Sequence, residues 1–120
     1  MYIQSYKDLI VWQKAILLIK ELYLVTQSFP KSELYSLTSQ TKRAALSIPA
    51  NIAEGYGRNS RKEYIQFYSI ALGSALELET HLIIAKELKF LSEMDYRKVT
   101  TLLEEIIKML RGLINKLKNK

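Results

Sequence analysis

Cysteine is absent from this chain of 120 residues, and only two prolines, four glycines and one histidine occur in it. Without cysteine, the chain has no disulfide framework, no thiolate nucleophile and no cysteine-ligated zinc. So few turn-forming residues disfavour an all-β fold, which needs many turns. The hydrophobic fraction of 48% is typical of globular proteins, and the length predicts one domain spanning residues 1–120.

Long apolar runs are also missing. Charges at Lys7, Asp8, Lys14 and Lys20 interrupt the N-terminal segment, so no run approaches the roughly 20 apolar residues that a membrane span requires. The segment also lacks the basic region followed by an unbroken apolar stretch that is typical of a signal peptide. We therefore expect a cytoplasmic protein that does not bind membranes.

Positive charge is in moderate excess, with a formal net charge of +6. Residues 92–120 hold seven basic and four acidic side chains, which gives this segment alone a charge of +3. An excess of this size suits a polyanionic partner such as nucleic acid, but it is also common in ordinary soluble proteins. Charge alone therefore leaves the partner open.

A first helix is predicted from Ser5, because Ser5 and Asp8 have the spacing of a capping box. One helix face then follows at three- and four-residue steps, through Leu9, Trp12, Ile16, Ile19, Tyr23 and Thr26. Further apolar residues lie off this face, at Ile10, Leu17, Leu18, Leu22 and Val25. A helix that is apolar on two sides is not expected in a small monomer, so we expect an oligomer.

Pro30 separates the first helix from a second one. Helical spacing resumes through Leu34, Leu37, Thr41, Ala44, Ile48 and Ile52. It ends at Gly55 or Gly57, because glycine best tolerates a left-handed C-terminal cap. Pro49 predicts a kink in this helix, with Ser47 and Asn51 placed to bond the freed backbone groups. Whether the kink only curves the helix around the core or shapes an interface is open.

Two more capping boxes, Ser60 with Glu63 and Ser92 with Asp95, open a third and a fourth helix. The third helix has Tyr64, Phe67, Ala71, Ala75, Leu78, Leu82 and Ala85 in register, and the fourth has Tyr96, Val99, Leu103, Ile106, Leu110, Leu113 and Leu117. We therefore predict an all-α, antiparallel, up-and-down four-helix bundle. Small residues around Gly73 would let a helix of this chain or of a neighbour approach closely.

The residue patterns of common catalytic sites are missing from this sequence. His81 is the only histidine and Glu77 precedes it by four residues, so the Glu-x-x-His pairs of a di-iron bundle are missing and we instead expect His81 to pair with Glu77. A serine or threonine nucleophile lacks an evident base. The stretch "GYGRNSRK" follows a helix rather than a strand and lacks the glycine spacing of a phosphate-binding loop. We expect no enzymatic activity, no metal and no cofactor.

Glu54 falls in the last turn of the second helix, where a carboxylate faces the negative end of the helix macrodipole. An arginine would offset this cost. We expect an ion pair with Arg58, or with Arg43 or Arg61 across the fold. The alternative is a solvated surface glutamate.

Several separate motifs together carry a family resemblance over residues 6–91. They are "FP" and "EL" (Phe29, Pro30, Glu33, Leu34), "LTSQ" (37–40), "SIPANIAEG" (47–55), "GR" (57–58) and "IALGSALELET" (70–80). In order and spacing they resemble the bacterial four-helix-bundle proteins first noticed as reading frames inside intervening sequences of 23S rRNA genes. The same family includes the accessory variability protein of diversity-generating retroelements. The resemblance implies a ring-shaped homopentamer, a basic surface that engages nucleic acid and, in the retroelement branch, a reverse-transcriptase partner.

Two functions are consistent with these patterns. The first is a non-enzymatic, homo-oligomeric RNA- or DNA-binding protein, in which the basic residues nearest the motif contact phosphates: Lys42, Arg43, Arg58, Arg61 and Lys62. The second is an oligomeric protein-interaction scaffold without direct nucleic-acid binding, for example an accessory partner of a reverse transcriptase. The arginines distinguish the two, because arginines tied to Glu54, Glu63 or Glu77 favour the scaffold.

Overall fold

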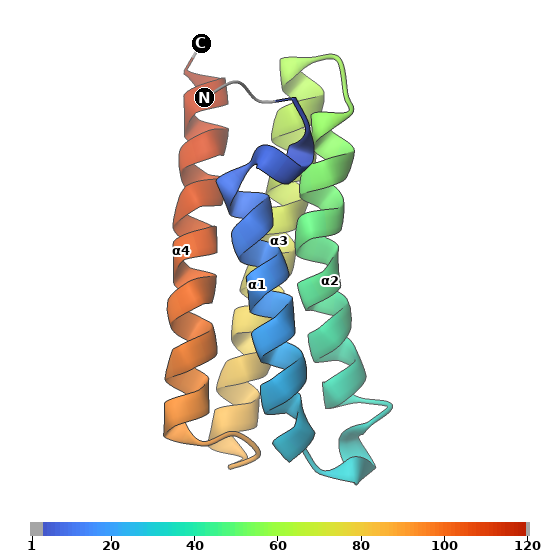
Figure 1. Cartoon of the computed structure of the whole chain (residues 1–120), viewed down its shortest axis with the longest axis vertical. Coiled ribbons are helices and arrows are strands. Elements are labelled where there is room, and N and C mark those ends of the chain that lie inside the picture. Colours follow the sequence, from blue (N-terminus) through green and yellow to red (C-terminus); the bar gives the residue numbers. More distant parts are fainter. Residues whose placement is uncertain (1–3, 120) are drawn as a thin grey trace.

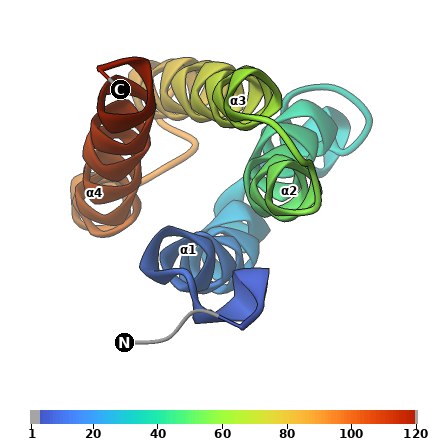
Figure 2. The same cartoon turned by 90° about the horizontal axis from the view of Figure 1, so that it is seen from above.

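Four antiparallel α-helices make up the computed structural model, which describes residues 4–119 (Figure 1). They are α1 (Ile10–Val25), α2 (Leu37–Tyr56), α3 (Arg61–Glu87) and α4 (Glu93–Lys118). A short 3-10 helix, η1 (Tyr6–Asp8), precedes α1, and two others, η2 (Thr26–Ser28) and η3 (Lys31–Glu33), connect α1 to α2. The helices follow one another around the bundle in chain order, and α4 returns to lie beside α1 (Figure 2). The predicted antiparallel four-helix bundle is confirmed.

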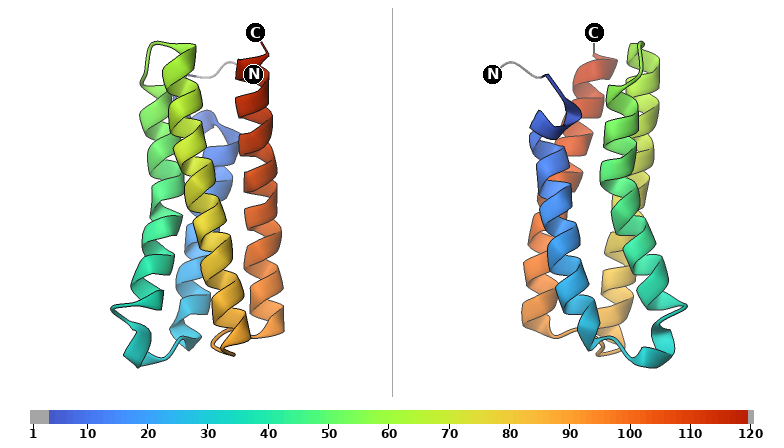
Figure 3. Two further views of the ribbon diagram at one scale, coloured as in Figure 1. Left: turned by 180° about the vertical axis from the view of Figure 1, so that it is seen from behind. Right: turned by 45° about the vertical axis from the view of Figure 1, so that its right-hand side comes forward.

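The two ends of the bundle differ in the elements that they carry (Figure 3). The end called here the α2–α3 end holds η1, the turn between α2 and α3, and the C-terminal turn of α4. The opposite end, called here the α1–α2 end, holds η2, η3 and the turn between α3 and α4. Within residues 4–119, no helix has the length and apolar character needed to cross a membrane.

Serine caps begin the two long helices as the sequence predicts. Ser60 Oγ accepts a hydrogen bond from the Glu63 backbone N–H at 3.2 Å, and Ser92 Oγ accepts one from the Asp95 N–H at 3.1 Å. At the N-terminus the prediction is wrong, because Ser5 caps η1 and not an α-helix. Leu9 then adopts an extended conformation (φ −72°, ψ 126°), so that α1 begins only at Ile10.

The start of α2 differs from the predicted one, whereas its end beside Gly57 agrees with the prediction and only the conformation of that glycine differs. The helix begins at Leu37 rather than Leu34, because η3 and a turn occupy residues 31–36. It ends at Tyr56, and Gly57 follows with φ −79°, so the predicted left-handed glycine cap is wrong. Pro49 lies inside α2, which continues through it as helix; the kink itself stays a prediction.

The core is built from one buried face of each helix. Its α2, α3 and α4 residues include those predicted from spacing, such as Ile48, Leu78 and Leu103. On α1 the buried residues are instead Val11, Ala15, Leu18, Leu22 and Val25. The face predicted from spacing is half-buried over most of its length and exposed at Tyr23. Because α1 is apolar around much of its circumference, its spacing fits two neighbouring faces, and only packing against the other helices selects one.

Candidate interaction surface

A polar seam joins the middle of α2 to α3 next to Pro49. The Asn51 side-chain amide donates to the Ser47 carbonyl at 2.8 Å and to the Ser47 hydroxyl at 2.9 Å. The Ser47 hydroxyl in turn shares a hydrogen bond of 2.8 Å with the hydroxyl of Ser74 on α3. Asn51 therefore bonds the Ser47 carbonyl and not the Ala45 carbonyl that Pro49 leaves without its helical donor, so that part of the prediction stays a prediction. The bond between Ser47 and Ser74 ties the two helices together.

Gly55 lies in close contact with Phe67 of α3. It is buried, and a Cβ added there would lie 2.8 Å from the Cβ of Phe67, a separation at which one of the two must move. The motif thus requires a glycine at position 55 for close helix contact rather than for a left-handed conformation, since no glycine among the described residues has a positive φ.

Glu54 and Arg58 form the predicted ion pair. Arg58 Nη2 lies 2.9 Å from Glu54 Oε1, and Arg58 Nη1 lies 4.0 Å from Glu63 Oε2 on α3. The guanidinium also covers the ring of Phe67, with 4.7 Å between its Cζ and the ring centroid. Arg58 is therefore held by two carboxylates and an aromatic ring across the turn between α2 and α3.

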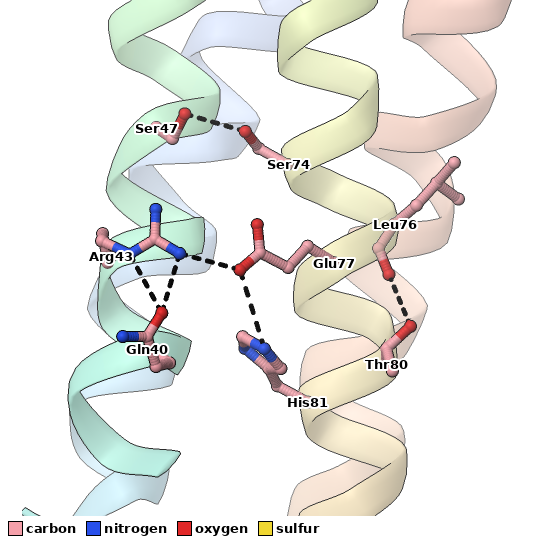
Figure 4. A network of polar contacts seen from close by, with 8 residues as sticks. All are labelled: Gln40, Arg43, Ser47, Ser74, Leu76, Glu77, Thr80 and His81. Carbon is pink, nitrogen blue, oxygen red and sulfur yellow. Dashed lines mark hydrogen bonds and ion pairs between the residues drawn. The ribbon is translucent and has the colours of Figure 1, made fainter. Parts of the chain in front are cut away.

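Arg43 is also bound to carboxylate and amide groups, although its side chain is 62% exposed (Figure 4). Its Nη2 donates to Glu77 Oε2 at 3.0 Å, and its Nε and Nη2 both donate to Gln40 Oε1. Glu77 Oε2 also lies 3.7 Å from Nε2 of His81, which confirms the predicted pairing of this histidine. The network links α2 to α3 toward the α1–α2 end.

The five predicted nucleic-acid-binding residues do not form one patch. Arg58, Arg61 and Lys62 lie at the α2–α3 end, and Arg61 and Lys62 are exposed in the first turn of α3. Lys42 and Arg43 precede Arg58 by 16 and 15 residues, which along a helix is on the order of 20 Å. Lys42 lies over the ring of Tyr23 on α1, with its Nζ 4.5 Å from the centroid.

Lys42 instead lies at the same surface hollow as two lysines that are not among the five predicted residues. Lys20 of α1 and Lys31 of η3 line the same surface hollow as Lys42. These three residues lie 11 positions or more apart in the chain, so no local motif connects them. Only the packing of α1 against α2 brings them together.

Large apolar side chains lie on the outer surface of α1. Ile10, Leu17 and Leu24 are spaced seven residues apart and are 48%, 48% and 59% exposed. Beside Ile10, a groove of about 550 Å³ runs between α1 and α4, and its apolar walls include Met109 and Leu113. The predicted second apolar side of α1 is therefore present, although Leu18, Leu22 and Val25, which were expected to share it, are in the core.

Shifted pKa values occur outside the motif. Burial raises the pKa of Tyr68. A hydrogen bond from Lys86 lowers the pKa of Glu93, and a hydrogen bond to Glu21 raises the pKa of Lys98. Across residues 4–119, no group of three or more histidine, aspartate or glutamate side chains is arranged to hold a metal ion.

The helix order defines a four-helix-bundle protein. Its second and third helices are in close contact at Gly55 and share the hydrogen bond between Ser47 and Ser74. The chain belongs to the family of 23S rRNA-intervening sequence proteins, whose family model matches residues 7–112. In fold it is similar to a crystal structure from Bacteroides thetaiotaomicron of a protein with unknown function from the S23 ribosomal protein family. That similarity has a TM-score of 0.81 and 24% identity, and it covers 88% of this chain and 98% of the other. No curated protein matches the chain.

Proposed function

We propose that the protein is a non-enzymatic, self-associating scaffold that binds a partner polypeptide. The observation that carries this proposal is the pairing of the motif arginines. Arg43 is bound by Glu77, and Arg58 is bound by Glu54 and Glu63. Because a phosphate competes with these carboxylates, each pair weakens phosphate binding, by up to about 1 kcal/mol for arginine side chains that are 62% and 40% exposed.

The exposed apolar surface of α1 supports self-association. Ile10, Leu17 and Leu24 recur every seven residues, so they point to the same side of the helix over about 20 Å. Burying one such side chain stabilises an interface by about 1.5–3 kcal/mol. The family resemblance adds a ring of five protomers as the expected assembly and a reverse transcriptase as one class of polypeptide partner.

Sedimentation of a Leu17→Glu variant tests self-association. If Leu17 is buried between protomers, a carboxylate there removes apolar contact and leaves a charge without a partner. We expect the dissociation constant to rise by at least about 100-fold. Asn115→Glu, which adds the same charge at an exposed position of α4, is the matched control and leaves the assembly intact. A wild-type chain that sediments as a monomer at micromolar concentration would contradict the proposal.

Nucleic-acid binding is the second candidate, and a different set of cations favours it. Lys62 lies in the first turn of α3, Lys116 and Lys118 lie in the last turn of α4, and all three are exposed. Within the described part of the chain they take part in no ion pair. Such lysines are available to phosphates, and an assembly repeats them several times, so a modest charge per protomer becomes a multivalent surface.

Salt-dependent binding of a structured RNA separates the two functions. Changing Lys62, Lys116 and Lys118 to glutamine should weaken binding and flatten its dependence on salt, because fewer counterions are released. Lys98→Gln is the control, since Lys98 is held by Glu21 at 2.9 Å at the opposite end. If the protein has no affinity for the RNA, or an affinity that is unchanged between roughly 50 and 200 mM salt, nucleic-acid binding through these lysines is wrong and the scaffold function remains.

A further inference from the structure

A hollow of about 380 Å³ opens at the α1–α2 end. Its walls come from the C-terminal turns of α1, the connection through η2 and η3, and the first two turns of α2. Tyr23, Leu24, Phe29, Pro30 and Leu34 give it an aromatic and aliphatic lining. This volume is within the range of small-molecule sites, which are mostly apolar with a few polar groups that orient the ligand.

Positive charge surrounds this lining. Lys20, Lys31 and Lys42 all contribute to the walls, and no acidic side chain does among the described residues. Glu33, the nearest carboxylate in the connection, accepts a hydrogen bond of 2.7 Å from the Ser36 hydroxyl. The ammonium of Lys42 is held over the Tyr23 ring, an arrangement that fixes a flexible side chain at the edge of the hollow.

The start of α2 also contributes polar groups. The Ser36 hydroxyl donates to Glu33 and makes no cap hydrogen bond to α2, so this side chain leaves the first backbone N–H groups of the helix uncapped. Thr38, the second residue of α2, lines the hollow. It is 6% exposed, and its hydroxyl has no hydrogen-bond partner within residues 4–119. A buried hydroxyl without a partner costs roughly 1–3 kcal/mol, and a ligand oxygen would remove that cost.

We propose that this hollow binds a small organic anion, with its carboxylate, sulfonate or phosphate group between the three lysines and its flat or aliphatic body against Tyr23, Phe29 and Leu34. The hollow is short and closed on one side by the chain's own connection, which favours a small molecule over an extended polymer. The hollow shares Leu24 with the outer stripe of α1 but contains none of the motif arginines, so its three lysines can be tested separately from the scaffold function.

Dye binding to the full-length protein tests the proposal with two probes of similar shape. Anilinonaphthalene sulfonate carries the anion and the aromatic body, whereas phenylnaphthylamine carries only the aromatic body. We expect the sulfonate dye to bind the wild-type chain more tightly than the neutral dye. The Lys20→Gln/Lys42→Gln double variant should lose about tenfold in affinity for the sulfonate dye, because charge-assisted contacts are lost, with no change for the neutral dye.

Lys62→Gln is the matched control, because Lys62 is an exposed lysine at the other end of the bundle. Equal losses in the control and the double variant would show a general charge effect and overturn the site. Equal affinity of the wild type for both dyes would also overturn the site, because it would show that binding does not require the anionic group. If a single-stranded RNA displaces the sulfonate dye from the wild type but not from the double variant, the hollow belongs to a nucleic-acid surface and the small-molecule assignment is wrong.

Discussion

Gly55 should be the least replaceable glycine of the chain, because it is where α2 and α3 touch. In Gly55→Ala, the new methyl group would lie 2.8 Å from the Phe67 Cβ. Both atoms are fixed to their backbones, so relief requires the helices to separate rather than a side chain to rotate. Forcing an extra carbon into a packed contact typically costs about 1–3 kcal/mol.

The expected free-energy change combines this cost with helix propensity. Alanine is more favourable than glycine in a helix interior by about 1 kcal/mol, but Gly55 is the penultimate residue of α2, so it recovers only part of that gain. The net expectation is a loss of about 1–2 kcal/mol, or roughly 3–10 °C in Tm for a domain of this size.

Gly73 provides the matched control for this prediction. It is exposed in the middle of α3, and an added Cβ would meet nothing within 4 Å. Gly73→Ala should therefore stabilise the chain by about 1 kcal/mol. The two variants are compared by urea unfolding followed by circular dichroism, at several protein concentrations so that dissociation and unfolding are separated. If Gly55→Ala stabilises the protein as much as Gly73→Ala does, the close contact inferred at Gly55 is wrong.

Four further substitutions probe separate features of the bundle. Gly57→Ala should change stability by less than about 0.5 kcal/mol in the same unfolding assay, because Gly57 has a right-handed conformation. A larger loss would instead indicate that Gly57 adopts the left-handed conformation. Ser60→Ala removes the acceptor for the Glu63 N–H and should cost about 1 kcal/mol, with no loss if water caps the helix equally well. Thr41→Val removes a fully buried hydroxyl without a partner in residues 4–119 and should raise the unfolding free energy by about 1 kcal/mol, whereas a decrease would reveal a hidden hydrogen bond. Burial raises the pKa of Tyr68 above 10.0, so its stabilising contribution is complete below pH 10.0 and is lost as pH rises through the folded-state pKa. A tyrosinate absorbance titration should lose its latest step in Tyr68→Phe, and an unchanged last step would contradict the assignment.

The buried face of a helix was predicted correctly where one side of the helix is apolar and the other is polar. In α4, the exposed residues Thr101, Glu104 and Lys108 lie on the other side from the apolar positions between Val99 and Leu110, so one face is favoured for burial, and that face is buried. In α1 the same method selected a face that is only half-buried, because Leu18 and Leu22 compete with Trp12 and Ile19 for the core. Periodicity predicts that a helix forms, but it needs polar residues on the other face to predict its rotation.

Charge pairs were predictable only when both partners lie within one helical turn or one tight connection. Glu54 and Arg58 are four residues apart, and their ion pair was expected and is present. Arg43 and Glu77 are 34 residues apart, and their contact depends on the register between α2 and α3, which spacing within one helix does not contain. The same limit explains why the hollow formed by Lys20 and Lys42 was not foreseen.

The small residues near the middle of α3 differ in their surroundings, and their small size alone did not predict which of them are buried. Ala71 and Ala75 are buried, and Ser74 bonds to Ser47 on α2, whereas Gly73 faces outward with open space around it. Within the described chain, Gly73 lowers helix stability by about 1 kcal/mol and makes no compensating contact. If a neighbouring protomer packs closely against this position, Gly73→Ala should stabilise the isolated bundle and yet weaken the assembly in sedimentation. A variant that is more stable and assembles as the wild type does would place the interface elsewhere, and the stripe at Leu17 on α1 would then be the better candidate.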